Sequence, residues 1–192
     1  MYLLIAGLVI FFGAHSIVIA SPRLRDTLRA RLGEGAWRGI YSVVSLAGFV
    51  LICKGFALAR LAATVLYTPP SWLRYVAVVL MLPVFPLMLA SGLPGRIRTG
   101  MKHPLLAGIK FWALAHLLAN GMLADVLLFG SFLAWAVIDR ISLKRRPPQF
   151  IRTVPERPWN DATAVMLGLA VYAIFLLGAH RWLFGVAPLG PF

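Results

Sequence analysis

Long apolar runs separated by short polar connectors make up most of this chain. A transmembrane helix needs about 20 consecutive apolar residues, and fewer where the bilayer is locally thin. The runs that approach this length are Tyr2–Ala20, Ile40–Leu61, Trp72–Ala90, Leu105–Ala119, Leu123–Ile138 and Ala162–Leu183. The pattern predicts an all-α protein, a polytopic integral membrane bundle of about six transmembrane helices that forms a single domain over residues 1–192.

Turn and breaker residues add detail to this pattern. The short fourth run is joined to the fifth only by Asn120-Gly121-Met122, which predicts a tight helical hairpin. Pro83 and Pro86 should kink the third run unless neighbouring groups satisfy the freed carbonyls. Asn160 and Asp161 precede the sixth run and are expected to form its N-cap region.

Positive charges gather in alternate connectors. The first, third and fifth connectors carry Arg23, Arg25, Arg29, Arg31 and Arg38; then Arg96, Arg98 and Lys102; then Arg140, Lys144, Arg145, Arg146, Arg152 and Arg157. The second and fourth connectors carry none. Because basic loops stay in the cytoplasm, we expect both termini outside. No basic segment precedes the first run, so we expect an uncleaved first helix.

Composition supports the membrane assignment. Hydrophobic residues make up 60% of the 192 residues and charged residues 13%, with a mean hydropathy of +0.84. The net charge of +13 could suggest nucleic acid as a partner. We reject that interpretation because the basic residues lie between apolar runs, which makes the lipid bilayer the expected partner. The single cysteine, Cys53, excludes an intrachain disulfide.

Histidines are the most informative polar residues. His15 and His116 lie inside apolar runs, where an ionisable side chain is costly and indicates a functional site. Imidazole is also the commonest metal ligand, although either ring could simply be hydrogen-bonded inside the bundle. His103 opens the fourth run, and His180, beside Trp182, is expected to be an interfacial anchor.

Other polar residues could support these rings. Asn120 follows His116 by one helical turn and could fix its tautomer, or serve only as a turn residue. Lys110 could extend its charge to the interface, or pair with Asp139, which has a matching depth. His103 and His116 would be about 20 Å apart along a continuous helix, so they cannot bind one metal.

Four segments together resemble one family of membrane proteins. The segments are GAHS, GEGAWRGIYS, KHPLLAG and AHLLANG, within a match over about residues 1–185. They resemble the NnrU family, which implies a multi-pass protein of the bacterial inner membrane. The family is associated with nitric oxide and nitrite metabolism in denitrification, so respiratory or denitrification membrane proteins are the implied partners.

The NnrU family is similar to zeta-carotene isomerase, a haem b membrane enzyme. The histidines implicated there as haem ligands match His15 and His116, so the resemblance implies haem b on these two rings, with His103, Asn120 and Lys110 as further cofactor-binding candidates. A cysteine that precedes the second ligand there is Ala113 here, which puts a thiolate ligand in doubt. The predicted topology places His15 in the cytoplasmic half and His116 near the outer end. A tilted or re-entrant fourth helix, a pair of His15 with His103, or the absence of haem would each remove this conflict.

A second resemblance supplies an alternative cofactor. KHPLLAG before a short helical hairpin resembles the Arg-His-Pro-x-Tyr region of isoprenylcysteine carboxyl methyltransferases, which bind S-adenosylmethionine. Lys102 stands for Arg and Leu106 for Tyr, and the acidic, Tyr-rich tail of those enzymes is missing. The resemblance therefore implies a shared architecture more than a shared reaction.

Overall fold

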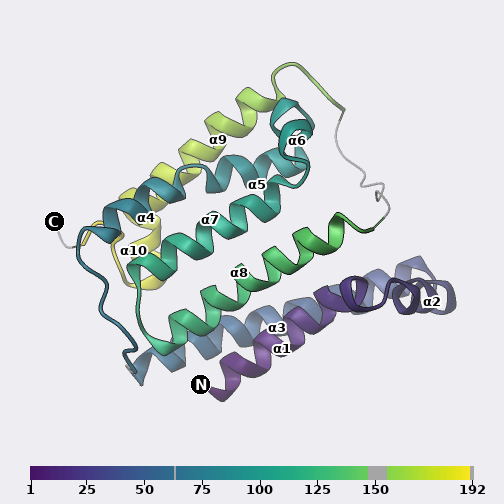
Figure 1. Cartoon of the computed structure of the whole chain (residues 1–192), viewed down its shortest axis with the longest axis horizontal. Coiled ribbons are helices and arrows are strands. Elements are labelled where there is room, and N and C mark those ends of the chain that lie inside the picture. Colours follow the sequence, from purple (N-terminus) through teal and green to yellow (C-terminus); the bar gives the residue numbers. More distant parts are fainter. Residues whose placement is uncertain (63, 147–154, 191–192) are drawn as a thin grey trace. The chain divides into compact units, whose positions relative to one another are not determined.

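The computed structural model describes residues 1–62, 64–146 and 155–190, and all regular elements within them are helices (Figure 1). In chain order they are α1 (Tyr2–Ala20), α2 (Pro22–Leu32), α3 (Glu34–Leu61), α4 (Leu73–Met81), α5 (Val84–Gly92), α6 (Arg96–Met101), α7 (Pro104–Ala119), α8 (Leu123–Leu143), α9 (Asn160–Ile174), the π-helix η1 (Phe175–Ala179) and α10 (His180–Phe184).

Among the described residues, five helical segments are long and apolar enough to cross a membrane. They are Tyr2–Ala20, Glu34–Leu61, Leu73–Gly92, Leu123–Leu143 and Asn160–Phe184. The shorter apolar helix Pro104–Ala119 matches the predicted fourth run. These helices confirm an all-helical, multi-pass membrane protein.

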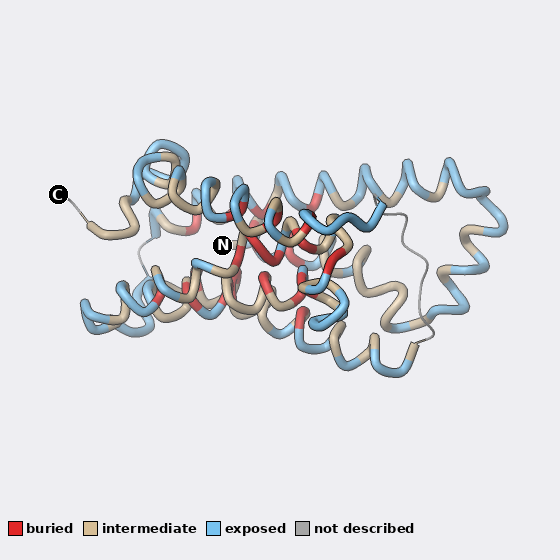
Figure 2. Tube along the Cα trace, turned by 90° about the horizontal axis from the view of Figure 1, so that it is seen from above, coloured by how far each residue is buried: buried red, intermediate tan, exposed pale blue. Residues whose placement is uncertain are grey.

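Large apolar side chains remain exposed along these helices. Leu177 is 85% exposed, Trp182 84% and Val9 67%. Figure 2 shows exposed and half-buried residues along most of the chain, with buried residues confined to short stretches. In water such a surface would aggregate, whereas acyl chains cover it at little cost. The exposed surface therefore agrees with a lipid environment.

The basic connectors that flank these helices are partly helical. The first connector forms α2, with Pro22 at its start and the hydroxyl of Ser21 accepting from the amide of Leu24 at 3.2 Å. Ser and Pro are favoured at these positions because they suit the unpaired amides of a helix start. In the fifth connector, residues 147–154, including Arg152, lie outside the described residues.

Two compact units make up the chain. The first unit comprises residues 1–67 and 122–131, and the second unit comprises residues 68–121 and 132–192. Helix α7 ends at Ala119 and α8 begins at Leu123, so the connection between the fourth and fifth runs is as short as predicted, and the tight hairpin itself stays a prediction. Within the first unit, the amide of Leu123 donates to the carbonyl of Thr64 at 2.8 Å.

The first unit is built on close contact between α1 and α3. A Cβ atom added at Gly7 would lie 2.6 Å from the amide nitrogen of Ile52, and one added at Gly48 would lie 2.8 Å from that of Phe11. Real Cβ atoms do not approach so closely, so only glycine fits here. Small residues of this kind let membrane helices pack backbone against backbone.

In the second unit, the third apolar run is interrupted as predicted. Helix α4 ends at Met81 and α5 begins at Val84, with Pro83 between them. The amide of Leu82 donates to the carbonyl of Val79 at 3.2 Å, so the regular helical bond to Val78 is not formed there. The hydroxyl of Tyr172 on α9 donates to the Val78 carbonyl at 3.0 Å. A neighbouring helix thus satisfies the freed group, as a proline break in a membrane requires.

The start of α9 differs from the prediction. The N-cap residue is Trp159, without a side-chain capping bond, and Asn160 and Asp161 are the first helical residues. The buried amide of Asn160 donates to the carbonyls of Pro94 at 2.7 Å and Pro155 at 3.1 Å. The carboxylate of Asp161 accepts from the amides at the start of α6. These two side chains fasten α9 to the third connector instead of capping their own helix.

Candidate functional site

His116 lies on α7 within the second unit, one turn before the helix ends. Its Nδ1 atom is 2.8 Å from the carbonyl oxygen of Trp112. A carbonyl can only accept, so Nδ1 carries the proton and, in the neutral ring, Nε2 carries the lone pair. The Trp112 ring lies 5.3 Å from the imidazole and packs edge-on against Phe132. The ring of His116 is therefore oriented by its own helix and by aromatic neighbours.

His180 is the ring that the structure brings to His116. The two ring centroids are 6.4 Å apart and their planes differ by 29°. The Nδ1 atom of His180 lies 2.6 Å from the carbonyl oxygen of Val186, which fixes the same tautomer as in His116. The ring centroid of Phe184 lies 5.0 Å from that of His180. The sequence predicted His180 as an interfacial anchor and did not predict that its ring lies beside His116.

The backbone before His180 is unusual. Residues Phe175–Ala179 form a π-helix between α9 and α10. A π-helical turn adds a residue to the turn and so rotates the residues that follow, and such turns are frequent at functional sites. Hydropathy gives no signal for this turn, so the position of His180 could not be read from the sequence.

His15 lies in the first unit, within a group of aromatic rings. Its Nδ1 atom is 2.7 Å from the carbonyl oxygen of Phe11, so the proton again lies on Nδ1. Its ring stacks on Phe11 with centroids 4.1 Å apart and lies 5.3 Å from Tyr41 of α3. His15 and His116 belong to different units, and their pairing stays a prediction.

Asn120 and Lys110 also lie in the second unit. The amide of Asn120 donates to the backbone carbonyl of His116 at 2.9 Å, which makes it a cap for the end of α7. Lys110 forms no ion pair within the described part of the chain, and Asp139 pairs with Arg146 instead. The side chains of Asp139 and Arg146 are only 14% and 10% exposed. Depth alone had suggested Lys110 as the partner, because the fold of residues after α8 was not visible in the sequence.

His103 is held at the start of α7 by a strained turn. Its amide donates to the carbonyl of Met101 at 2.7 Å across Lys102, whose φ is +60°. This is a γ-turn with a positive central φ, which is rare for a residue with a side chain. Burial and the charges of Arg140 and Arg146 lower the pKa of His103 below its usual value, whereas Asp139 opposes the shift. His103 is therefore a neutral ring among basic groups at neutral pH.

Since α7 is continuous from Pro104 to Ala119, His103 and His116 lie at its two ends. The rise of the helix separates them by about 20 Å. They cannot bind a common metal ion, as the sequence predicted.

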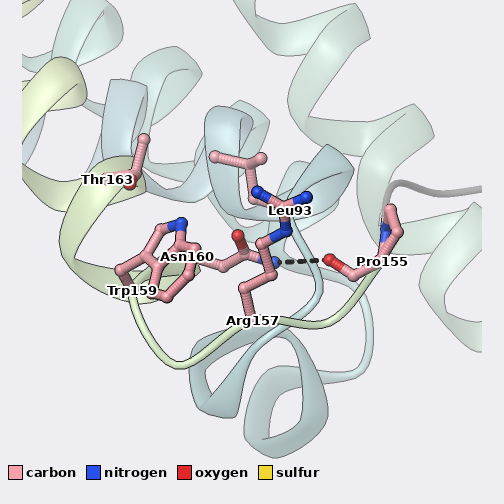
Figure 3. Close-up of a pocket in the computed structure, with 6 residues that line it drawn as sticks. All are labelled: Leu93, Pro155, Arg157, Trp159, Asn160 and Thr163. Atoms are coloured by element: carbon pink, nitrogen blue, oxygen red, sulfur yellow. Dashed lines mark hydrogen bonds between the residues drawn. The ribbon is translucent and has the colours of Figure 1, made fainter.

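A cavity of about 290 Å³ lies at the start of α9, lined by Leu93, Pro155, Arg157, Trp159, Asn160 and Thr163 (Figure 3). Arg157 lies 5.6 Å from the centroid of the Trp159 ring, and the Asn160 amide is bound to backbone carbonyls. Helical rise puts this cavity about 30 Å from His180 along the α9–α10 segment, so it does not belong to the histidine pair.

The described helices define an α-helical, multi-pass membrane protein with a pair of half-buried imidazole rings near the end of α7. Compared with known families, residues 3–188 match the family described as NnrU protein. The chain therefore belongs to the NnrU family, which confirms the resemblance carried by its four sequence segments. No curated protein and no solved structure matches the chain.

Proposed function

We propose that this chain is a haem b-binding protein of the bacterial inner membrane that acts in nitric oxide or nitrite metabolism. Membership of the NnrU family and the long apolar helices support the setting. The observation that carries the haem assignment is the ring of His116, whose Nδ1–H is held by the Trp112 carbonyl. Metal-binding histidines almost always donate their second N–H in this way.

The donor set of the chain suits this cofactor. Ferrous haem supplies an iron atom that can bind nitric oxide. His116 would hold one axial position, and the bond to Trp112 would keep its lone pair on Nε2. The resemblance offers His15 as the second ligand, whose Nδ1–H is likewise held by a helix carbonyl. Lys110, which has no ion pair in the described chain, is a candidate to bind a haem propionate.

The proposed topology has six spans with both termini outside. It is supported by the sequence, in which basic residues fill the connectors that contain α2 and α6, between α1 and α3 and between α5 and α7. Reporter fusions at Thr68 and Phe192 should report the periplasm, and a fusion at Arg145 the cytoplasm. A cytoplasmic signal at Thr68 would overturn the six-span arrangement.

An absorption spectrum of detergent-purified protein tests the haem assignment. Protein expressed with ample haem should show the bands of low-spin haem b, and nitric oxide should shift the bands of the ferrous form. His116→Ala should lose the low-spin spectrum. Colourless wild-type protein would overturn the proposal, and binding of S-adenosylmethionine by that protein would favour the methyltransferase alternative.

A further inference from the structure

The pair formed by His116 and His180 has the dimensions of two ligands on one metal. Two metal–nitrogen bonds of about 2.0 Å and two imidazole radii of about 1.1 Å add up to about 6.2 Å between ring centroids. The observed distance is 6.4 Å. An angle of 29° between the ring planes leaves the rings close to parallel, as two axial ligands on opposite sides of a metal can be.

The Nδ1 atoms of both rings form the same kind of hydrogen bond. Each Nδ1 atom is within 2.8 Å of a backbone carbonyl oxygen, from Trp112 for His116 and from Val186 for His180. Each neutral ring therefore carries its lone pair on Nε2. A hydrogen bond of this kind fixes the tautomer and raises the basicity of a ligating imidazole.

The number of ligands identifies the kind of metal group. A bare zinc or copper ion in a protein usually takes three or four protein ligands. Among the described residues, no group of three or more His, Cys, Asp or Glu side chains could hold a metal ion. A haem needs only two axial ligands from the protein because its macrocycle supplies the other four. Two imidazoles without a third donor therefore suit haem iron better than a bare ion.

The backbone gives independent support for His180. The π-helix Phe175–Ala179 ends immediately before it and sets the direction in which its ring projects. Such a turn breaks the regular bonding of a helix and is frequently found at functional sites. The bond from His180 to Val186 then ties this ring to the chain that follows α10.

Depth in the membrane also favours this pair. In the six-span topology, α7 ends and the last apolar segment ends on the outer side, so His116 and His180 lie at the same level. His15, by contrast, lies about five residues from the cytoplasmic end of α1, roughly 8 Å along the axis. A pair of His116 with His180 removes the conflict that the pair of His15 with His116 creates.

We propose that His116 and His180 are the two axial ligands of the haem. This proposal rests on the proposed function, since it requires that haem b is bound. It assigns His15 to the packing of α1 against α3, where its ring stacks on Phe11 and lies beside Tyr41.

Single variants of all four histidines, read by absorption and electron paramagnetic resonance spectra, test the assignment. His116→Ala and His180→Ala should each convert low-spin haem to high-spin haem or lose it, and added imidazole should restore the low-spin signal. His15→Ala and His103→Ala test the rival ligand pairs, and both should retain the wild-type spectrum if His116 and His180 hold the iron.

A second variant guards against simple misfolding. His180→Met keeps a ligating side chain, and an axial methionine raises the reduction potential of haem iron. We expect a low-spin spectrum with a raised potential, which a merely structural role for His180 would not produce.

The outcomes separate the two proposals. Colourless wild-type protein overturns the proposed function and this assignment together. A coloured wild type with an unchanged His180→Ala spectrum overturns only the axial pair. Loss of the spectrum in His15→Ala with retention in His180→Ala would instead identify the pair that the family resemblance implies.

Discussion

The first and second units both pack helices closely at glycines, at Gly48 against Phe11 and at Gly168 against Pro86, but they differ in the regularity of their backbone. In the first unit, α1 and α3 meet through glycines, and both helices run without interruption. In the second unit, the third apolar segment breaks at Pro83, a π-helix precedes His180, and a strained turn precedes α7. Side-chain hydrogen bonds from Tyr172, Asn160 and Asp161 support this irregular backbone.

This difference indicates where the chain has room for chemistry. A regular helix pair packed backbone to backbone leaves little space for a ligand and is stabilised mainly by van der Waals contact. Irregular backbone in a membrane is costly unless its polar groups are satisfied, so it persists where it positions functional side chains. The histidine pair lies in the irregular unit, whereas His15 lies in the regular one.

We expect the largest loss of stability when the buried ion pair of the second unit is broken. Asp139→Ala leaves the guanidinium of Arg146 buried, with its Nε already lacking a partner, so we expect a loss of about 3 kcal/mol of unfolding free energy. Thermal unfolding in detergent measures it. Lys110→Ala should melt like the wild type, because Asp139 pairs with Arg146.

The first unit offers the matched comparison. Glu34 forms solvent-exposed ion pairs with Arg29 and Arg38, and such pairs contribute little to stability. Glu34→Ala should therefore leave the melting temperature close to that of the wild type. Equal losses in Asp139→Ala and Glu34→Ala would mean that burial does not distinguish these two pairs.

We expect the next largest loss of stability when a side chain is introduced at a glycine between α1 and α3 in the first unit. Gly48→Leu forces a side chain against the backbone of Phe11, so α1 and α3 must separate, at an expected cost of about 2–3 kcal/mol. Gly13→Leu is the control, because a Cβ atom there meets nothing within 4 Å. Melting curves that show the same loss for both variants would contradict the close packing of α1 on α3.

We expect a smaller loss of stability when the hydrogen bond that supports the proline break is removed. Tyr172→Phe removes only the hydroxyl that donates to Val78, and we expect a loss of about 1 kcal/mol. Tyr75→Phe is the matched control, since Tyr75 is 61% exposed. Faster amide exchange near Val78 and Val79 in Tyr172→Phe would locate the effect at the break, and unchanged exchange would argue against this role.

Much of the fold could be read from hydropathy because the bilayer allows few alternatives. The apolar runs, the short connection after Ala119 and the break at Pro83 all follow from local sequence. The long-range polar contacts do not, because hydropathy cannot show that Asn160 reaches Pro94 or that Asp139 pairs with Arg146. For the candidate site, the sequence indicated His116 as a site residue and His180 as an interfacial anchor, and it gave no signal for the π-helix that precedes His180.

The smallest expected effect concerns the pH dependence of the second unit. In the unfolded chain His103 gains its proton near its ordinary pKa of about 6.5. In the folded chain burial, Arg140, Arg146 and Lys102 lower this pKa, and only Asp139 opposes them. Between the two pKa values the unfolded chain binds more protons, so the free energy of unfolding decreases as the pH falls below about 6.5. His103→Gln removes the titrating group and should flatten this decrease while melting like the wild type above that pH. Melting temperatures measured across this range, at constant ionic strength, test the expectation. Parallel curves of melting temperature against pH for the variant and the wild type would show that the basic neighbours do not lower the pKa of His103. A steeper curve for His103→Gln would show that folding raises this pKa instead.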